Sequence, residues 1–150
     1  MTPSTDILIG DTDGQYVLIR PLCRKHPGLF DYQEGNWIDC EFEVAAGAFR
    51  GKFRADLRSE EFHALREDTE GLSRALEGSA SFNTVEGCIA LTLTGDGNGA
   101  VRVSGEAVDL ADAGNRLLFD FEIEQTCLPD ICQSLEYLLA AFPVTGTRES

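Results

Sequence analysis

The sequence has few basic residues. It contains 12 lysines and arginines against 26 aspartates and glutamates, which gives a formal net charge of −14 and an isoelectric point near 4.3. Nucleic-acid phosphates and anionic membrane surfaces both bind through clustered lysine and arginine. The composition therefore argues against a nucleic acid or a membrane as a partner. It favours a basic protein partner or, more simply, a well-solvated surface.

Long apolar runs are also missing. No stretch approaches the ~20 residues that a membrane-spanning helix needs, and the first residues lack the basic and apolar segments of a secretory signal peptide. The five cysteines are odd in number, widely spaced and without a CxxC pair. We therefore expect a cytoplasmic protein with reduced thiols.

Motifs for catalysis and for cofactors are scarce. There is no GxxxxGK loop and no strand followed by GxGxxG, so a phosphate cradle is not indicated. Cys23 and His26 form a single CxxH pair, which is half of a structural zinc site. The stretches GDTDG (10–14) and GDGNG (95–99) lack the spacing of a calcium loop and are typical of turns. The sequence predicts no metal, no cofactor and no catalytic residue.

The clearest structural pattern is an alternation of apolar and charged residues in two neighbouring segments, 37–44 and 49–57. A short link with a glycine joins them, which predicts an antiparallel hairpin with one face in the core. We place Val44 opposite Phe49, a register that sets the acids of the first strand against the bases of the second. A shift by one residue would turn the aromatic side chains to solvent.

Two helices are predicted, at about 59–77 and 129–141. Both carry an apolar stripe at helical spacing, and we expect Ser59 to cap the first. Short strands joined by tight turns make up the rest, which gives a largely antiparallel sheet or sandwich of about seven to eight strands. Since there is no linker or repeat, the sequence predicts a single α+β domain over residues 1–150.

Three acidic residues occupy every second position of a predicted strand within DFEIEQTCLPD (120–130). If the segment 101–108 pairs with this strand, it offers one base, Arg102, and one further acid. The ordinary interpretation is a solvated strand face, because exposed charges usually contribute little. The functional hypothesis is a surface that binds a basic protein partner. Its residues are Asp120, Glu122, Glu124 and Glu106.

Several longer stretches carry a resemblance to a known family. They are FRGKFRADLRSEEF (49–62), LEGSASFNTVEG (76–87), LTGDGNGAVRVSGEA (93–107) and GNRLLFDFEIEQTCLPDICQSLE (114–136), with the shorter NWI and AFP. From Trp37 to Gly146 the chain resembles small bacterial proteins of the WapI-like immunity family. The resemblance implies a cytoplasmic antitoxin that binds the nuclease domain of a secreted toxin, and it brings no catalytic residue with it.

We therefore hypothesise an immunity-type binding protein, not an enzyme, which neutralises a basic toxin nuclease domain through an acidic surface. One alternative is a small cytoplasmic enzyme or ligand-binding domain, which would need a cleft with convergent polar groups. Another is a structural or oligomeric domain. The sequence leaves the oligomeric state open.

Overall fold

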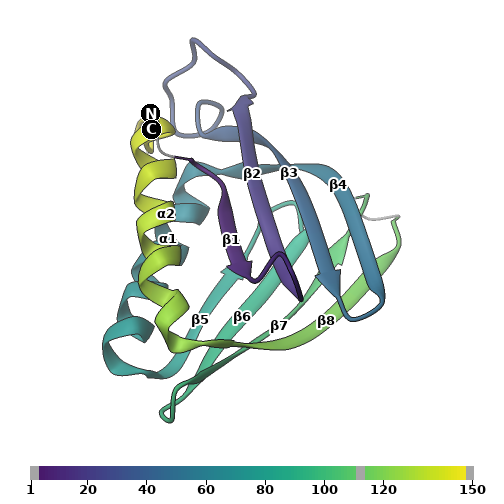
Figure 1. The fold of residues 1–150 in the computed structure, drawn as a ribbon. Coiled ribbons are helices and arrows are strands. Elements are labelled where there is room, and N and C mark those ends of the chain that lie inside the picture. Colours follow the sequence, from purple (N-terminus) through teal and green to yellow (C-terminus); the bar gives the residue numbers. More distant parts are fainter. Residues whose placement is uncertain (1–3, 111–113, 148–150) are drawn as a thin grey trace.

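The computed structural model describes residues 4–110 and 114–147, which fold into two four-stranded antiparallel sheets and two helices (Figure 1). The predicted α+β class, the strand number and the two helices are confirmed. The first sheet contains β1 (Ile7–Gly10), β2 (Tyr16–Arg24), β3 (Trp37–Ala46) and β4 (Phe49–Arg58), in that order. After α1 (Ser59–Ala75), the second contains β5 (Glu77–Asn83), β6 (Ile89–Asp96), β7 (Ala100–Val108) and β8 (Arg116–Glu124). A 3-10 turn, η1 (Gln125–Cys127), leads into α2 (Leu128–Ala141).

The inner faces of the two sheets pack against each other around one hydrophobic core. Every second residue of β3 and of β8 enters or borders this core, as the alternation in the sequence predicts. Three phenylalanines anchor it, one from each sheet and one from α1: Phe42, Phe82 and Phe62. Burial of such side chains contributes about 1.5–3 kcal/mol each, which makes the sheet-to-sheet contact the main source of stability.

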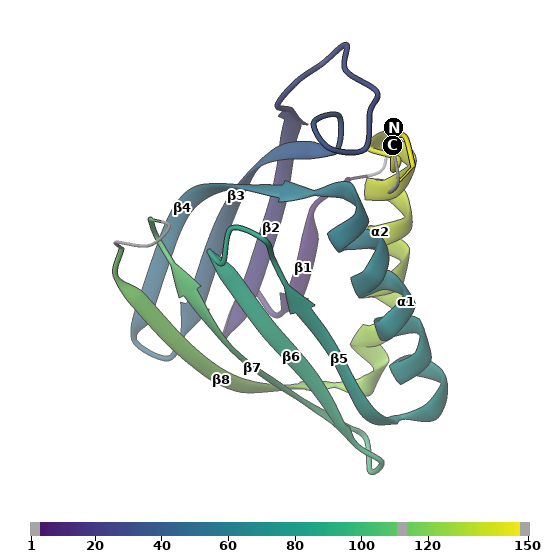
Figure 2. The same ribbon diagram turned by 180° about the vertical axis from the view of Figure 1, so that it is seen from behind.

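The strands of the two sheets cross, and the helices cover one side of the sandwich (Figures 1 and 2). There α1 packs on β5 and on α2, and α2 reaches β1. On the opposite side lie β4 and β8, the last strands of their sheets. Within the described residues, no helix is both long and apolar enough to cross a membrane.

The start of α1 differs from the prediction. The N-cap is Arg58, and its N–H donates to Glu61 Oε1 at 2.7 Å, so a side chain from inside the helix satisfies the first free amide. Ser59 is already helical and buried, and its hydroxyl has no hydrogen-bond partner among the described residues. The prediction that Ser59 caps the helix was wrong, because the chain enters the helix one residue earlier.

The register of the hairpin formed by β3 and β4 also differs from the prediction. Val44 lies opposite Gly51 rather than Phe49, because both strands continue to a tight turn at Gly47 and Ala48. Gly47 has φ of 61°, the left-handed conformation that such turns require. The error is two residues, so every side chain keeps its predicted face. Two expected ion pairs still form as diagonal neighbours: Asp39–Arg54 and Glu41–Lys52.

Candidate partner-binding surface

The four carboxylates predicted from the sequence lie together on the outer face of the second sheet. β7 pairs with β8 as expected, from Val108 opposite Arg116 to Ala100 opposite Glu124. The inward residues of β8 are buried, and the acids that alternate with them are exposed. The predicted set therefore occupies two adjacent strands: Asp120, Glu122 and Glu124 on β8, and Glu106 on β7.

Two arginines partly neutralise this set. Arg102 Nη2 lies 2.6 Å from Asp120 Oδ2, and Arg116 forms an ion pair with Glu106. The hydrogen bond to Asp120, with the attraction of Asp120 and Glu122, raises the pKa of Arg102. The sequence analysis counted only Arg102, and that count was wrong, because Arg116 at the start of β8 reaches across to β7. The second sheet therefore carries fewer unpaired carboxylates than predicted. Those that remain lie at the C-terminal end of β8, away from Arg116.

The remaining negative charge gathers where β8 ends. Within residues 4–110 and 114–147, Glu122 and Glu124 form no ion pair. Both line a groove of about 370 Å³ together with Asp11, which belongs to the turn between β1 and β2. An adjoining groove of about 210 Å³ is lined by Glu122 and by Asp96 at the end of β6. We call these four residues, Asp11, Asp96, Glu122 and Glu124, the acidic end.

Sequence reasoning missed Asp11 and Asp96 as members of this surface. The sequence indicated a turn at both positions. Asp11 lies in the turn between β1 and β2, whereas Asp96 is the last residue of β6, directly before the connection to β7. Asp11 Oδ1 accepts the N–H of Asp13 at 2.9 Å, and Asp96 Oδ1 accepts the N–H of Asn98 at 2.6 Å. The acidic composition of the two turns was the available signal. Asp96 lies near β8 because β6, β7 and β8 are neighbours in one sheet. The proximity of Asp11 follows instead from the crossing of the two sheets, which local patterns do not encode (Figure 1).

The outer face of the first sheet is also charged, but most of its charges are paired. Arg20 lies 3.3 Å from Asp6 and 2.8 Å from Glu41. Exposed pairs of this kind add little stability, yet each one cancels part of the local field. A basic partner therefore meets less free negative charge here than at the acidic end. The other pairs on this face are Arg54–Asp39, Lys52–Glu41 and Lys25–Asp56.

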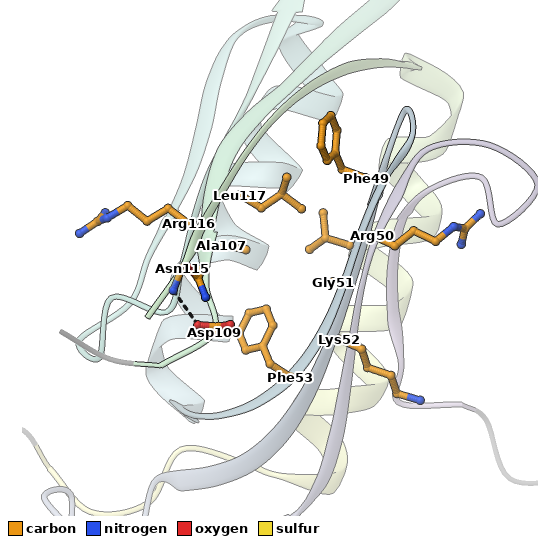
Figure 3. Close-up of a pocket in the computed structure, with 11 residues that line it drawn as sticks. Phe49, Arg50, Gly51, Lys52, Phe53, Ala107, Asp109, Asn115, Arg116 and Leu117 are labelled. Carbon is orange, nitrogen blue, oxygen red and sulfur yellow. Dashed lines mark hydrogen bonds between the residues drawn. The ribbon is translucent and has the colours of Figure 1, made fainter. Parts of the chain in front are cut away.

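A cavity of about 270 Å³ opens between β4 and β8, on the side that the helices leave uncovered (Figure 3). Three charged side chains at its rim point away from it, Arg50, Lys52 and Arg116. Asp109 lies at one end, where its Oδ1 accepts the N–H of Asn115 at 2.8 Å. The described residues that line the cavity hold no convergent polar groups for catalysis. The apolar part of the lining is formed by Val44, Phe49, Phe53, Ala107 and Leu117.

Among the described thiols, Cys40 is buried and Cys132 is half-buried. Burial raises the pKa of the Cys40 thiol. Cys132 is less deeply buried, and burial raises the pKa of its thiol as well. Both thiols therefore stay protonated at neutral pH. In the part of the chain that the structure describes, no group of three or more His, Cys, Asp or Glu side chains is placed to hold a metal ion. The expectation that the protein needs no metal or cofactor stays a prediction.

Comparison with known proteins gives one family match. The family model of the immunity protein WapI-like family matches residues 7–143. A search of curated proteins gave no match. Among solved structures, the chain is similar to MRP1/MRP2 of Trypanosoma brucei, with a TM-score of 0.48 and 8% identity over 95% of this chain and 88% of the other. It is also similar to a chain of the CdiA-CT/CdiI toxin and immunity complex from Enterobacter cloacae, with a TM-score of 0.42 and 12% identity over 79% and 97%. Both likenesses are distant.

Proposed function

The chain belongs to the immunity protein WapI-like family, and from that premise we propose that it neutralises a protein toxin by binding it through the outer face of β8. The observation that carries the proposal is the run of exposed acids on β8, of which Glu122 and Glu124 lack an ion pair among the described residues. An immunity protein works by association rather than by catalysis, so the proposed surface needs complementary charge and shape but no reactive group.

The proposed partner is a basic toxin domain, such as a nuclease domain with a phosphate-binding surface. Carboxylates at every second residue of a strand lie about 7 Å apart and present a row of negative charge. Lysines and arginines that bind phosphate also bind such a row. The net charge of −14 adds a long-range field that accelerates the encounter with a cationic protein.

We predict that a neighbouring gene encodes the toxin, and the test is the association kinetics between this protein and that toxin's domain. We expect the triple substitution Asp120→Gln, Glu122→Gln and Glu124→Gln to lower the association rate roughly tenfold at low salt. Added salt should lower the wild-type rate and affect the variant less.

A matched control removes three acids elsewhere. Glu67, Asp68 and Glu136 lie on the exposed surface of the helices, and their conversion to Gln or Asn changes the net charge equally. An equal fall in the association rate for both triple variants would assign the effect to net charge and would contradict a surface on β8. An association rate that neither triple variant changes would also contradict a binding surface on β8.

A further inference from the structure

We propose that β8 recognises its partner by strand addition. An extended segment of the partner pairs with the free edge of β8, with basic side chains beside the acidic row and apolar side chains in the cavity between β4 and β8. This inference rests on the proposed function, because it takes the partner to be a basic protein. Three features of the described chain carry it: a free backbone edge, its charge and the cavity beneath it.

The first feature is the backbone of β8. Its outer edge has no strand partner among the described residues. The ladder between β7 and β8 is flanked by two hydrogen bonds, from the Asp109 N–H to the Asn115 carbonyl at 3.2 Å and from the Gln125 N–H to the Gly99 carbonyl at 2.9 Å. In an antiparallel pair, bonded and non-bonded positions alternate. Counting from either end leaves the same amides at the free edge, those of Arg116, Leu118, Asp120, Glu122 and Glu124. The last four lie along the acidic row.

The second feature is the opposite charge of the two free edges on this side. β8 exposes three carboxylates, and β4 exposes Arg50, Lys52 and Arg54. Charges on an edge strand prevent indiscriminate pairing between sheets. An acidic edge still admits a strand of opposite charge, because each added base meets a carboxylate across the new pair. Lys52 and Arg54 are paired with Glu41 and Asp39, so the positive field at β4 is partly cancelled. A basic segment is therefore attracted to β8 and gains no such attraction at β4.

The third feature is the apolar cavity beside this edge. Side chains of an added strand alternate between the two faces of the sheet, so every second one points inward. Next to Leu117 such a side chain enters the cavity, where Phe49 is 68% exposed. Space is available, because a Cβ placed on Gly51 has no atom within 4 Å. The recognised segment therefore alternates basic and apolar residues.

A peptide titration followed by NMR tests this mode of binding without a toxin. The probe is an eight-residue peptide of alternating lysine and valine, acetylated and amidated at its ends. We expect it to slow hydrogen exchange at the free-edge amides of Leu118, Asp120, Glu122 and Glu124. A peptide with four lysines followed by four valines has the same charge and composition, and a glutamate–valine peptide has the opposite charge. Neither should protect these amides. Protection by the block peptide, or protection on β4 instead of β8, would overturn strand addition.

Three variants separate the contribution of the cavity from that of charge. Gly51→Val directs a side chain into the cavity and leaves every charge in place, and we expect it to weaken binding of the alternating peptide about tenfold. Glu43→Lys alters the charge of the first sheet by the same amount as Glu122→Lys alters that of β8. Only the change on β8 should weaken binding. If Gly51→Val binds the peptide as the wild type does, the cavity plays no part and the inference fails.

Hydrogen exchange in the complex with the toxin domain distinguishes this inference from the proposed function. A toxin domain that binds with a salt-sensitive rate but leaves the four free-edge amides unprotected would sustain the proposed function and overturn strand addition. A toxin domain that does not bind would overturn the proposed function, while the peptide result would still report on the edge.

Discussion

Glu61 is a partly buried carboxylate that joins two elements of the fold. Its Oε1 accepts the N–H of Arg58 at the start of α1, and its Oε2 accepts the N–H of Val85 after β5, both at 2.7 Å. Burial raises the pKa of this carboxyl, and the two backbone hydrogen bonds offset only part of that rise. A single side chain thus satisfies two amides and titrates above its ordinary range.

The raised pKa of Glu61 predicts a pH dependence of stability. Between the ordinary value of 4.5 and the raised value, the folded state binds more protons than the unfolded chain. The stability from this difference is present below the ordinary value and is lost as the pH rises through the raised one. We therefore expect Glu61→Gln, measured by urea denaturation, to lose less stability than the wild type as the pH rises above 4.5. Parallel profiles would contradict this expectation. Glu67→Gln, exposed on the same helix, is the control.

At the scale of elements, the hairpin of β3 and β4 contains two glycines that should respond differently to the same substitution. Gly51 lies in the interior of β4 with an ordinary backbone and open space around its missing side chain. Gly47 lies in the turn with φ of 61°, where a β-branched residue is strained. Identical substitutions at these two positions therefore separate the effect of packing from the effect of backbone conformation.

We expect Gly51→Val to raise the free energy of unfolding by about 1 kcal/mol, because valine favours a strand and fills part of the cavity. Gly47→Val should lower it by about 1–2 kcal/mol, because the left-handed conformation clashes with a branched Cβ. Urea denaturation of both variants, with the slope of the transition unchanged, provides the measurement. A loss of stability at Gly51 would mean that the cavity cannot accept a side chain.

The same hairpin shows which features the sequence could predict. Alternation assigned each side chain of β3 and β4 to its face, because burial of one face requires a period of two. It could not set the register, since any even shift preserves the faces. The tight turn at Gly47 decided the register instead. On β8, alternation placed Asp120, Glu122 and Glu124 outside. The proximity of Asp11 to Glu122 and Glu124 depends on how the two sheets cross, which no local pattern specifies.

At the scale of the whole molecule, charge is distributed unevenly between the two sheets. The outer face of the first sheet holds most of the cross-strand ion pairs, whereas the carboxylates of the acidic end form no ion pair with any described residue. A net charge of −14 on a chain of 150 residues opposes the compact state through self-repulsion. The field that would attract a basic toxin therefore also lowers the stability of the free protein.

The excess negative charge both attracts a basic partner and destabilises the folded chain. Salt should therefore have opposite effects on folding and on binding. Raising the salt concentration from about 10 mM to about 150 mM shortens the screening length from about 30 Å to about 8 Å. Repulsion among the excess acids weakens, so the midpoint of thermal unfolding should rise, while the association rate with a basic partner should fall. Glu122→Lys with Glu124→Lys removes part of the excess, so it should unfold at a higher temperature than the wild type at low salt and respond less to added salt. If salt lowers the unfolding midpoint instead, the ion pairs outweigh the repulsion, and the acidic end carries no cost in stability.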